Sequence, residues 1–233
     1  MPTIPPMPKL PLGFLGPQAK FKTFKLDIFS HTNSIIRLFN GNQVTIRIGY
    51  TYPTLMDFEL QNADTGRDGS KYVYKEIDED EQVVKFNITL PRKGSWKFMI
   101  FAQPVHDEAG GSGLENVYNY LLLCARISKK AKPYPRQSKE WREGFALRSP
   151  TDIGPDKAGT EVSFSLTIPN ASGVSVVIDQ EWTELERMSS QSNEWSGKVF
   201  LHKRYFGYGE KVSVNVRFQE NCPSYATVLE YTI

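Results

Sequence analysis

The chain has 233 residues, 39% of them hydrophobic, and a formal net charge of +2. This much apolar and aromatic surface can fill packed cores, which excludes a disordered class, and a charge so close to neutral gives no long-range attraction for nucleic acid. No apolar stretch approaches the roughly 18 residues that a membrane span requires, so we expect no membrane span. From the length and the charge we expect one or two globular domains and no nucleic-acid partner.

Residues 1–19 form a proline-rich N-terminal segment that precedes any regular pattern. Prolines at this density prevent the continuous apolar helix of a secretory signal, so we expect a cytoplasmic protein or a fragment of a longer one. The P-x-x-P spacings at 5–8 and 8–11 can form polyproline II ligands, although proline-rich tails produce this spacing readily. Sequons at Asn87 and Asn170 keep open the alternative of a secreted or cell-surface protein.

Residues 20–128 predict a first immunoglobulin-like β-sandwich, because short segments with a side-chain period of two alternate with turn residues. In 43–50 every second residue is Val, Ile or Tyr, and Trp96, Phe98 and Ile100 form the inward row of another segment. The pattern predicts seven strands, near residues 22–30, 43–50, 54–61, 71–77, 82–90, 95–102 and 116–127.

Residues 129–143 predict a linker, since two prolines and a run of basic residues interrupt the strand pattern there. Basic and aromatic residues interleave in this stretch and are candidates for contact with an acidic surface or with nucleic acid, although a solvated linker is the simpler interpretation. The candidate contact residues are Lys129, Lys130, Lys132, Tyr134, Arg136 and Trp141.

Residues 144–233 repeat the signal of the first half and predict a second immunoglobulin-like β-sandwich. Alternation is clearest in 161–168, where Val, Phe, Leu and Ile occupy every second position. The predicted strands lie near 145–148, 160–168, 173–180, 183–188, 195–202, 209–219 and 224–233. The expected fold is therefore all-β, with two tandem antiparallel sandwiches, and "immunoglobulin-like" refers to the architecture only.

No catalytic or metal site is predicted. Nucleophilic catalysis requires a nucleophile beside a positioned base, whereas Cys124 lies in an apolar run, and the three histidines, His31, His106 and His202, are scattered along the chain. We expect Cys124 and Cys222 to be free thiols, because corresponding strands of successive sandwiches lie too far apart for a disulfide. We expect no enzyme activity, no cofactor, no metal and no small-molecule substrate.

The acidic run 76–81 has two interpretations. It can hold a cation, or it can be a solvated turn that protects a sheet edge, which is the commoner role of such runs. The loop 62–68 is similar: Asn62, Asp64 and Asp68 faintly suggest a calcium loop, but their spacing does not fit the EF-hand pattern, and an Asp-Gly hairpin turn accounts for them.

Four segments resemble the immunoglobulin-like repeats of the kyphoscoliosis peptidase and hillarin family. They are FKTFKLDIFSH at 21–31, LPRKGSWKFMIFA at 90–102, NYLLLC at 119–124 and WREGF at 141–145. Members of that family join such repeats to a transglutaminase-like core with a Cys-His-Asp triad. None of the cysteines or histidines of this chain falls in a segment that resembles the triad motifs, so the resemblance assigns no catalytic residue here.

The resemblance implies a non-catalytic protein-binding or scaffolding module, associated with the cytoskeleton, whose partner is another protein. It also leaves an alternative: an accessory region that positions substrate for a transglutaminase-like peptidase whose catalytic core is not in this chain.

Overall fold

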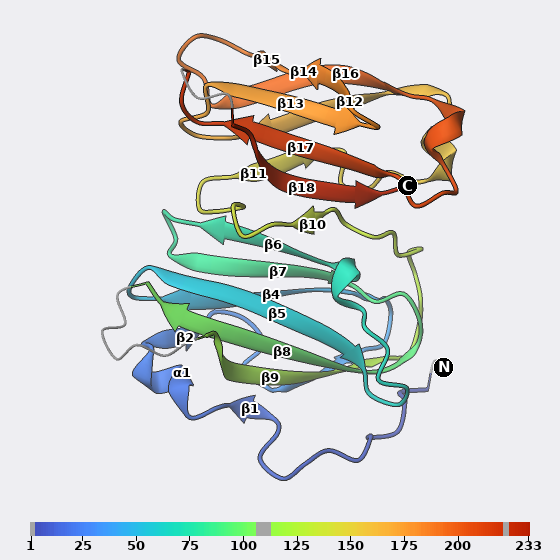
Figure 1. The fold of residues 1–233 in the computed structure, drawn as a ribbon. Coiled ribbons are helices and arrows are strands. Elements are labelled where there is room, and N and C mark those ends of the chain that lie inside the picture. Colours follow the sequence, from blue (N-terminus) through green and yellow to red (C-terminus); the bar gives the residue numbers. More distant parts are fainter. Residues whose placement is uncertain (1–2, 106–112, 221–223) are drawn as a thin grey trace. The chain divides into compact units, whose positions relative to one another are not determined.

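The computed structural model describes residues 3–105, 113–220 and 224–233 and divides the chain into two compact units, Met1–Lys132 and Pro133–Ile233 (Figure 1). Both units consist mainly of antiparallel strands, so the expected all-β, immunoglobulin-like fold class is confirmed. None of the helices in the described ranges is long and apolar enough to cross a bilayer. His106 and Cys222, named above, lie outside the described residues.

The first unit is a sandwich of two sheets with strand orders β2-β4-β7-β6 and β1-β9-β8-β5. β2 pairs antiparallel with β4 in one sheet, whereas β3 pairs parallel with β9 in the other, so the start of the domain contributes to both sheets. The strands are β1 (Gly16–Pro17), β2 (Leu26–Ile28), β3 (Ile35–Leu38), β4 (Gln43–Tyr50), β5 (Thr54–Asn62), β6 (Val73–Asp78), β7 (Val83–Thr89), β8 (Gly94–Pro104) and β9 (Glu115–Cys124).

The core of the first unit lies between its two sheets. Trp96, Phe98 and Ile100 are at most 2% exposed, which confirms the predicted inward row of β8. The ring of Phe86 on β7 packs edge-on against Phe98 with centroids 5.5 Å apart, so aromatic side chains join the two layers. Residues of both sheets share one apolar cluster.

The second unit is also a two-sheet sandwich, with strand orders β11-β12-β16-β15 and β10-β18-β17-β13-β14. Phe164 on β12 and Tyr231 on β18 meet edge-on at 6.1 Å and connect the layers. The strands are β10 (Arg136–Gln137), β11 (Ala146–Ser149), β12 (Thr160–Thr167), β13 (Gly173–Ile178), β14 (Glu181–Glu184), β15 (Glu186–Arg187), β16 (Glu194–Leu201), β17 (Lys211–Arg217) and β18 (Ala226–Thr232).

Short helical turns interrupt the strands: α1 (Lys20–Thr23), η1 (Ser70–Tyr72), η2 (Pro155–Lys157) and η3 (Lys203–Tyr205). α1 occupies the start of the region expected as the first strand. Phe21 and Phe24, three residues apart, are 7% and 6% exposed, and a helical turn places such a pair on the same side.

The segment expected as a linker, 129–143, is partly folded. β10 pairs antiparallel with β18, with Arg136 opposite Glu230, and the ring of Trp141 lies edge-on to Phe145 at 5.6 Å and is only 4% exposed. The reason is physical: a tryptophan this large stabilises the fold most when it leaves water. The N-terminal segment also contributes structure, since Gly16 and Pro17 form β1 against β9.

Candidate interaction surfaces

Three of the candidate contact residues, Lys129, Lys130 and Lys132, lie on the exposed chain that leaves β9 in the first unit. Asn42, which is fully buried, holds the start of this segment in place through hydrogen bonds. Its Nδ2 donates to the carbonyl of Lys129 at 2.9 Å and to that of Leu90 at 2.7 Å, and its Oδ1 accepts from the backbone N–H of Lys129 at 3.1 Å. The side chain of Lys129 is exposed while its backbone is held in place.

The other three candidates belong to the second unit, and they differ in their exposure to solvent. Arg136 is exposed on β10, and Tyr134 is half-buried. Trp141 is buried against Phe145 and so is not available to a partner in the folded chain. The six residues therefore do not form one exposed row: they divide between the two units, and one of them has an interior role.

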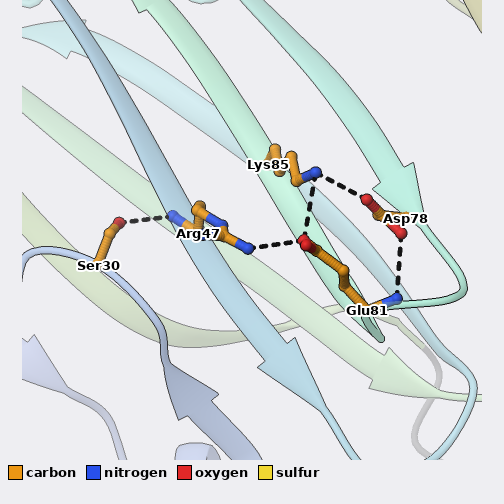
Figure 2. A network of polar contacts seen from close by, with 5 residues as sticks. All are labelled: Ser30, Arg47, Asp78, Glu81 and Lys85. Carbon is orange, nitrogen blue, oxygen red and sulfur yellow. Dashed lines mark hydrogen bonds and ion pairs between the residues drawn. The ribbon is translucent and has the colours of Figure 1, made fainter.

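The acidic run 76–81 supplies a polar network on the outer face of the first unit (Figure 2). The carboxylate of Asp78 lies 2.7 Å from the ammonium of Lys85, and that of Glu81 lies 2.6 Å from the guanidinium of Arg47 and 3.4 Å from Lys85. The hydrogen bond from Lys85 lowers the pKa of Asp78, and the same bond raises the pKa of Lys85. Two cations of the chain thus pair with Asp78 and Glu81, two of the carboxylates of this run, which favours the turn interpretation over cation binding.

The one described cysteine is in an inert setting. Cys124 is fully buried at the end of β9, and its thiol lies 3.4 Å from the carbonyl oxygen of Arg126. Burial raises the pKa of this thiol, whereas a nucleophilic cysteine needs a lowered one. No group of three or more His, Cys, Asp or Glu side chains with metal-binding geometry occurs among the residues that the structure describes.

The open edge of β5 is largely satisfied within the chain. At one end, the N–H of Leu60 donates to Ser70 Oγ at 3.0 Å, and the carbonyl of Leu60 accepts from Gly69 at 2.7 Å. At the other end, Lys75, whose pKa is lowered by burial, points inward from β6 and donates to the carbonyl of Met56 at 2.7 Å. An inward lysine at a sheet edge opposes the addition of another strand, so a face of the sandwich is a better candidate for partner binding than this edge.

An aromatic and cationic cluster on the second unit was not predicted. Trp182 on the edge strand β14 is 54% exposed, and its ring lies 4.9 Å from that of Tyr225, just before β18. The guanidinium of Arg217, at the end of β17, lies 5.5 Å from the Tyr225 ring. Gly173 leaves the room these side chains need, since a Cβ there would lie 3.3 Å from Arg217 Nη2 and 3.5 Å from the Tyr225 hydroxyl. The signal in the sequence was a tryptophan flanked by the polar residues Glu181 and Thr183, which is unusual for a core residue.

The outer face of β8 and β9 in the first unit is covered by the proline-rich N-terminal segment. Leu121 and Leu123 alternate with core residues of β9 and so face away from the core, yet they are 0% and 1% exposed. Ser95 Oγ donates to the carbonyl of Pro6 at 3.2 Å, and Asn119 Nδ2 donates to that of Phe14 at 2.9 Å. The segment then enters β1, which pairs with β9 (Figure 1).

Two sheets packed face to face, with one early strand in each sheet, define an immunoglobulin-like sandwich in the first unit. Residues 11–135, more than half of the chain, match the family model described as the KY-like, immunoglobulin-like domain. The chain therefore belongs to this family, and the resemblance to the repeats of the kyphoscoliosis peptidase family is confirmed. A comparison with curated proteins found no match.

Proposed function

We propose that this chain is a non-catalytic protein-binding module of the scaffolding type. Its family domain is an immunoglobulin-like sandwich, a kind of domain that generally lacks catalytic activity. The observation that carries the proposal is the cluster on the second unit in which the exposed Trp182 lies beside the half-buried Tyr225 and Arg217. Tryptophan, tyrosine and arginine are the residue types that most often dominate the energy of protein–protein interfaces.

The physical reason is the large surface that such side chains present. An exposed indole edge-on to a phenol gives a partner a broad apolar contact, and the nearby guanidinium adds hydrogen-bond donors and a charge. The cluster lies on a face of the sandwich, which fits the observation that the β5 edge of the first unit is satisfied internally. Fold alone does not assign function, so the proposal depends on these side chains.

The finer parts of the proposal are a cytoskeletal partner and a cytoplasmic location. Both come from the family resemblance. The exposed basic side chains of Lys129, Lys130 and Arg136 provide further positive charge for an acidic partner. Exposed charges outside the centre of an interface change the association rate and its salt dependence more than the final affinity.

Co-sedimentation of the full chain with purified actin filaments and with microtubules tests the proposal. We expect one of the two polymers to bring the chain into the pellet and Trp182→Ala to weaken this binding at least tenfold, as for an interface hot spot. Phe200→Ala is the matched control, because Phe200 is also an exposed aromatic residue, 47% exposed, but lies on the opposite sheet.

If neither polymer binds the chain, the cytoskeletal part of the proposal is wrong. If the chain binds but Trp182→Ala and Phe200→Ala reduce binding equally, the cluster is not the binding site.

A further inference from the structure

The covered outer face of β8 and β9 is built unlike the other exposed faces of the first unit. The opposite sheet presents charged and polar side chains to solvent, among them Arg47 and Lys85. The β9 face instead presents two leucines, Leu121 and Leu123, beside the two side chains, Ser95 and Asn119, that are hydrogen-bonded to the N-terminal segment. A sheet face of this apolar character needs an occupant.

The occupant in this structure is an extended segment without regular secondary structure. Between residues 3 and 15 the chain forms neither helix nor strand, and Ile4, Pro5, Pro8 and Leu10 are each partly buried. Proline has no backbone N–H, so a proline-rich segment cannot join a sheet through a hydrogen-bond ladder. It can still offer carbonyl oxygens as acceptors and its rings as apolar surface.

The outer face of β8 and β9 has hydrogen-bond donors for the carbonyl oxygens of such a segment. Its two polar groups in contact with the segment, the hydroxyl of Ser95 and the amide of Asn119, both act as donors and both reach carbonyl oxygens. These two side chains are 1% and 3% exposed, so the segment and its surroundings shield them from water. The second Asn119 partner is Asn116, whose Oδ1 lies 2.9 Å away and helps to fix the orientation of the amide.

We propose that the outer face of β8 and β9 is a binding surface for extended proline-rich segments, and that residues 3–14 occupy it in cis. The inference goes beyond the proposed binding at the aromatic cluster and names the partner class of a second surface: a segment with the polyproline character of TIPPMPKLPLGF, the sequence of residues 3–14. A partner with such a segment binds when the cis segment leaves the face.

The family match is consistent with a separable occupant. It begins at residue 11, so residues 3–10 precede the part of the chain shared with the family model, while β1 at Gly16–Pro17 lies within it. The β1 pairing anchors the segment at one end, and the preceding residues are attached to the face mainly through side-chain contacts.

A peptide with the sequence of residues 3–14 tests the proposal on the full chain. In a full-length variant with Pro5→Gly, Pro6→Gly and Pro8→Gly, the cis segment loses its extended preference. We expect the labelled peptide to bind this variant at least tenfold more tightly than the unaltered chain, because a tethered competitor acts at an effective concentration of order millimolar. A peptide with alanine at every proline should bind at least tenfold more weakly.

Two serine-to-alanine substitutions test whether the peptide binds at this face. In the glycine background, Ser95→Ala should weaken peptide binding about fivefold, the effect of one net hydrogen bond, whereas Ser163→Ala, on an exposed position of β12, should leave it unchanged. Circular dichroism checks that each variant is folded. If the glycine variant does not fold, the unaltered chain is titrated with millimolar peptide, and the methyl signals of Leu121 and Leu123 must shift.

Folded protein without peptide binding at millimolar concentration overturns the inference, and so does equal binding of the alanine peptide. Trp182→Ala separates this proposal from the previous one: it should reduce partner binding at the aromatic cluster and leave peptide binding at the β9 face unchanged.

Discussion

The packing of Trp96 against Gly69 gives the sharpest prediction. Gly69 has φ −125°, so its backbone conformation is open to alanine, but an added Cβ would lie 2.7 Å from Cζ3 of Trp96 and 3.2 Å from Cδ2 of Leu60. Trp96 is 2% exposed and Leu60 is fully buried, so neither can move away cheaply. We expect Gly69→Ala to destabilise the first unit through steric overlap alone.

The magnitude follows from two opposing terms. Overpacking a filled core costs about 1–3 kcal/mol, whereas replacing glycine by alanine recovers about 0.4–1 kcal/mol through the unfolded chain. The net loss for Gly69→Ala is therefore about 1–2 kcal/mol. Trp96→Ala should cost about 3–5 kcal/mol, since it empties a buried site of this size.

A double-mutant cycle isolates the contact. Trp96→Phe removes the colliding Cζ3 and leaves a void that the new methyl group of Gly69→Ala partly fills. The double variant should thus be more stable than the sum of the two single effects, by about 1 kcal/mol. Gly113→Ala is the matched control, because its Cβ would meet nothing within 4 Å.

Native-state hydrogen exchange of the β5 and β8 amides is the appropriate measurement, because it reports the first unit without contribution from the second. The reasoning is refuted if Gly69→Ala matches Gly113→Ala, or if the cycle shows no coupling.

Three further predictions concern polar groups of the first unit. Lys75→Met removes a buried charge and its bond to Met56, so the free energy of unfolding should change by less than about 1 kcal/mol, while sedimentation velocity should show more self-association through the unprotected β5 edge. Asp78→Asn should cost at most about 1 kcal/mol near pH 7, because the pair with Lys85 is partly exposed. The folded state lowers the pKa of Asp78 below 3.8, so this contribution is present above pH 3.8 and is lost as the pH falls through the folded-state pKa. Urea unfolding should therefore show a smaller difference between the variant and the unaltered chain at pH 2.5 than at pH 7. Asn42→Ala should cost about 3 kcal/mol because it removes hydrogen bonds to the buried carbonyl of Leu90 and to part-buried backbone groups of Ser128 and Lys129. Exchange of the backbone amide of Lys129 should accelerate.

The sequence was sufficient to predict strands of which only one face is buried. The segment 160–167 alternates because one face of β12 meets the core, so Val162, Phe164 and Leu166 were placed correctly. It was insufficient for β3, since Ile35–Leu38 does not alternate and its parallel pairing with β9 depends on a strand far along the chain. The sequence of a short non-alternating segment does not show with which distant strand the segment pairs.

Among the surface candidates, composition was a poor guide to exposure. Trp141 was grouped with its basic neighbours, but its ring is buried against Phe145. Trp182 and Tyr225 were not grouped, because they come from β14 and the start of β18 and meet only when the sheet has formed. The role of Asn42 was also missed, since a turn sequence alone does not reveal which side chain will cap the chain leaving β9.

The two early strands bonded to β9 would respond differently to tension along the chain. β3 runs parallel to β9, so a pull from its N-terminal side against a pull at the end of β9 loads all of their shared backbone bonds at once, in shear. β1 runs antiparallel to the same strand, so the same pull peels its bonds one after another. Under force, the proline-rich segment would therefore detach first and leave a still-closed sandwich with its leucine face uncovered.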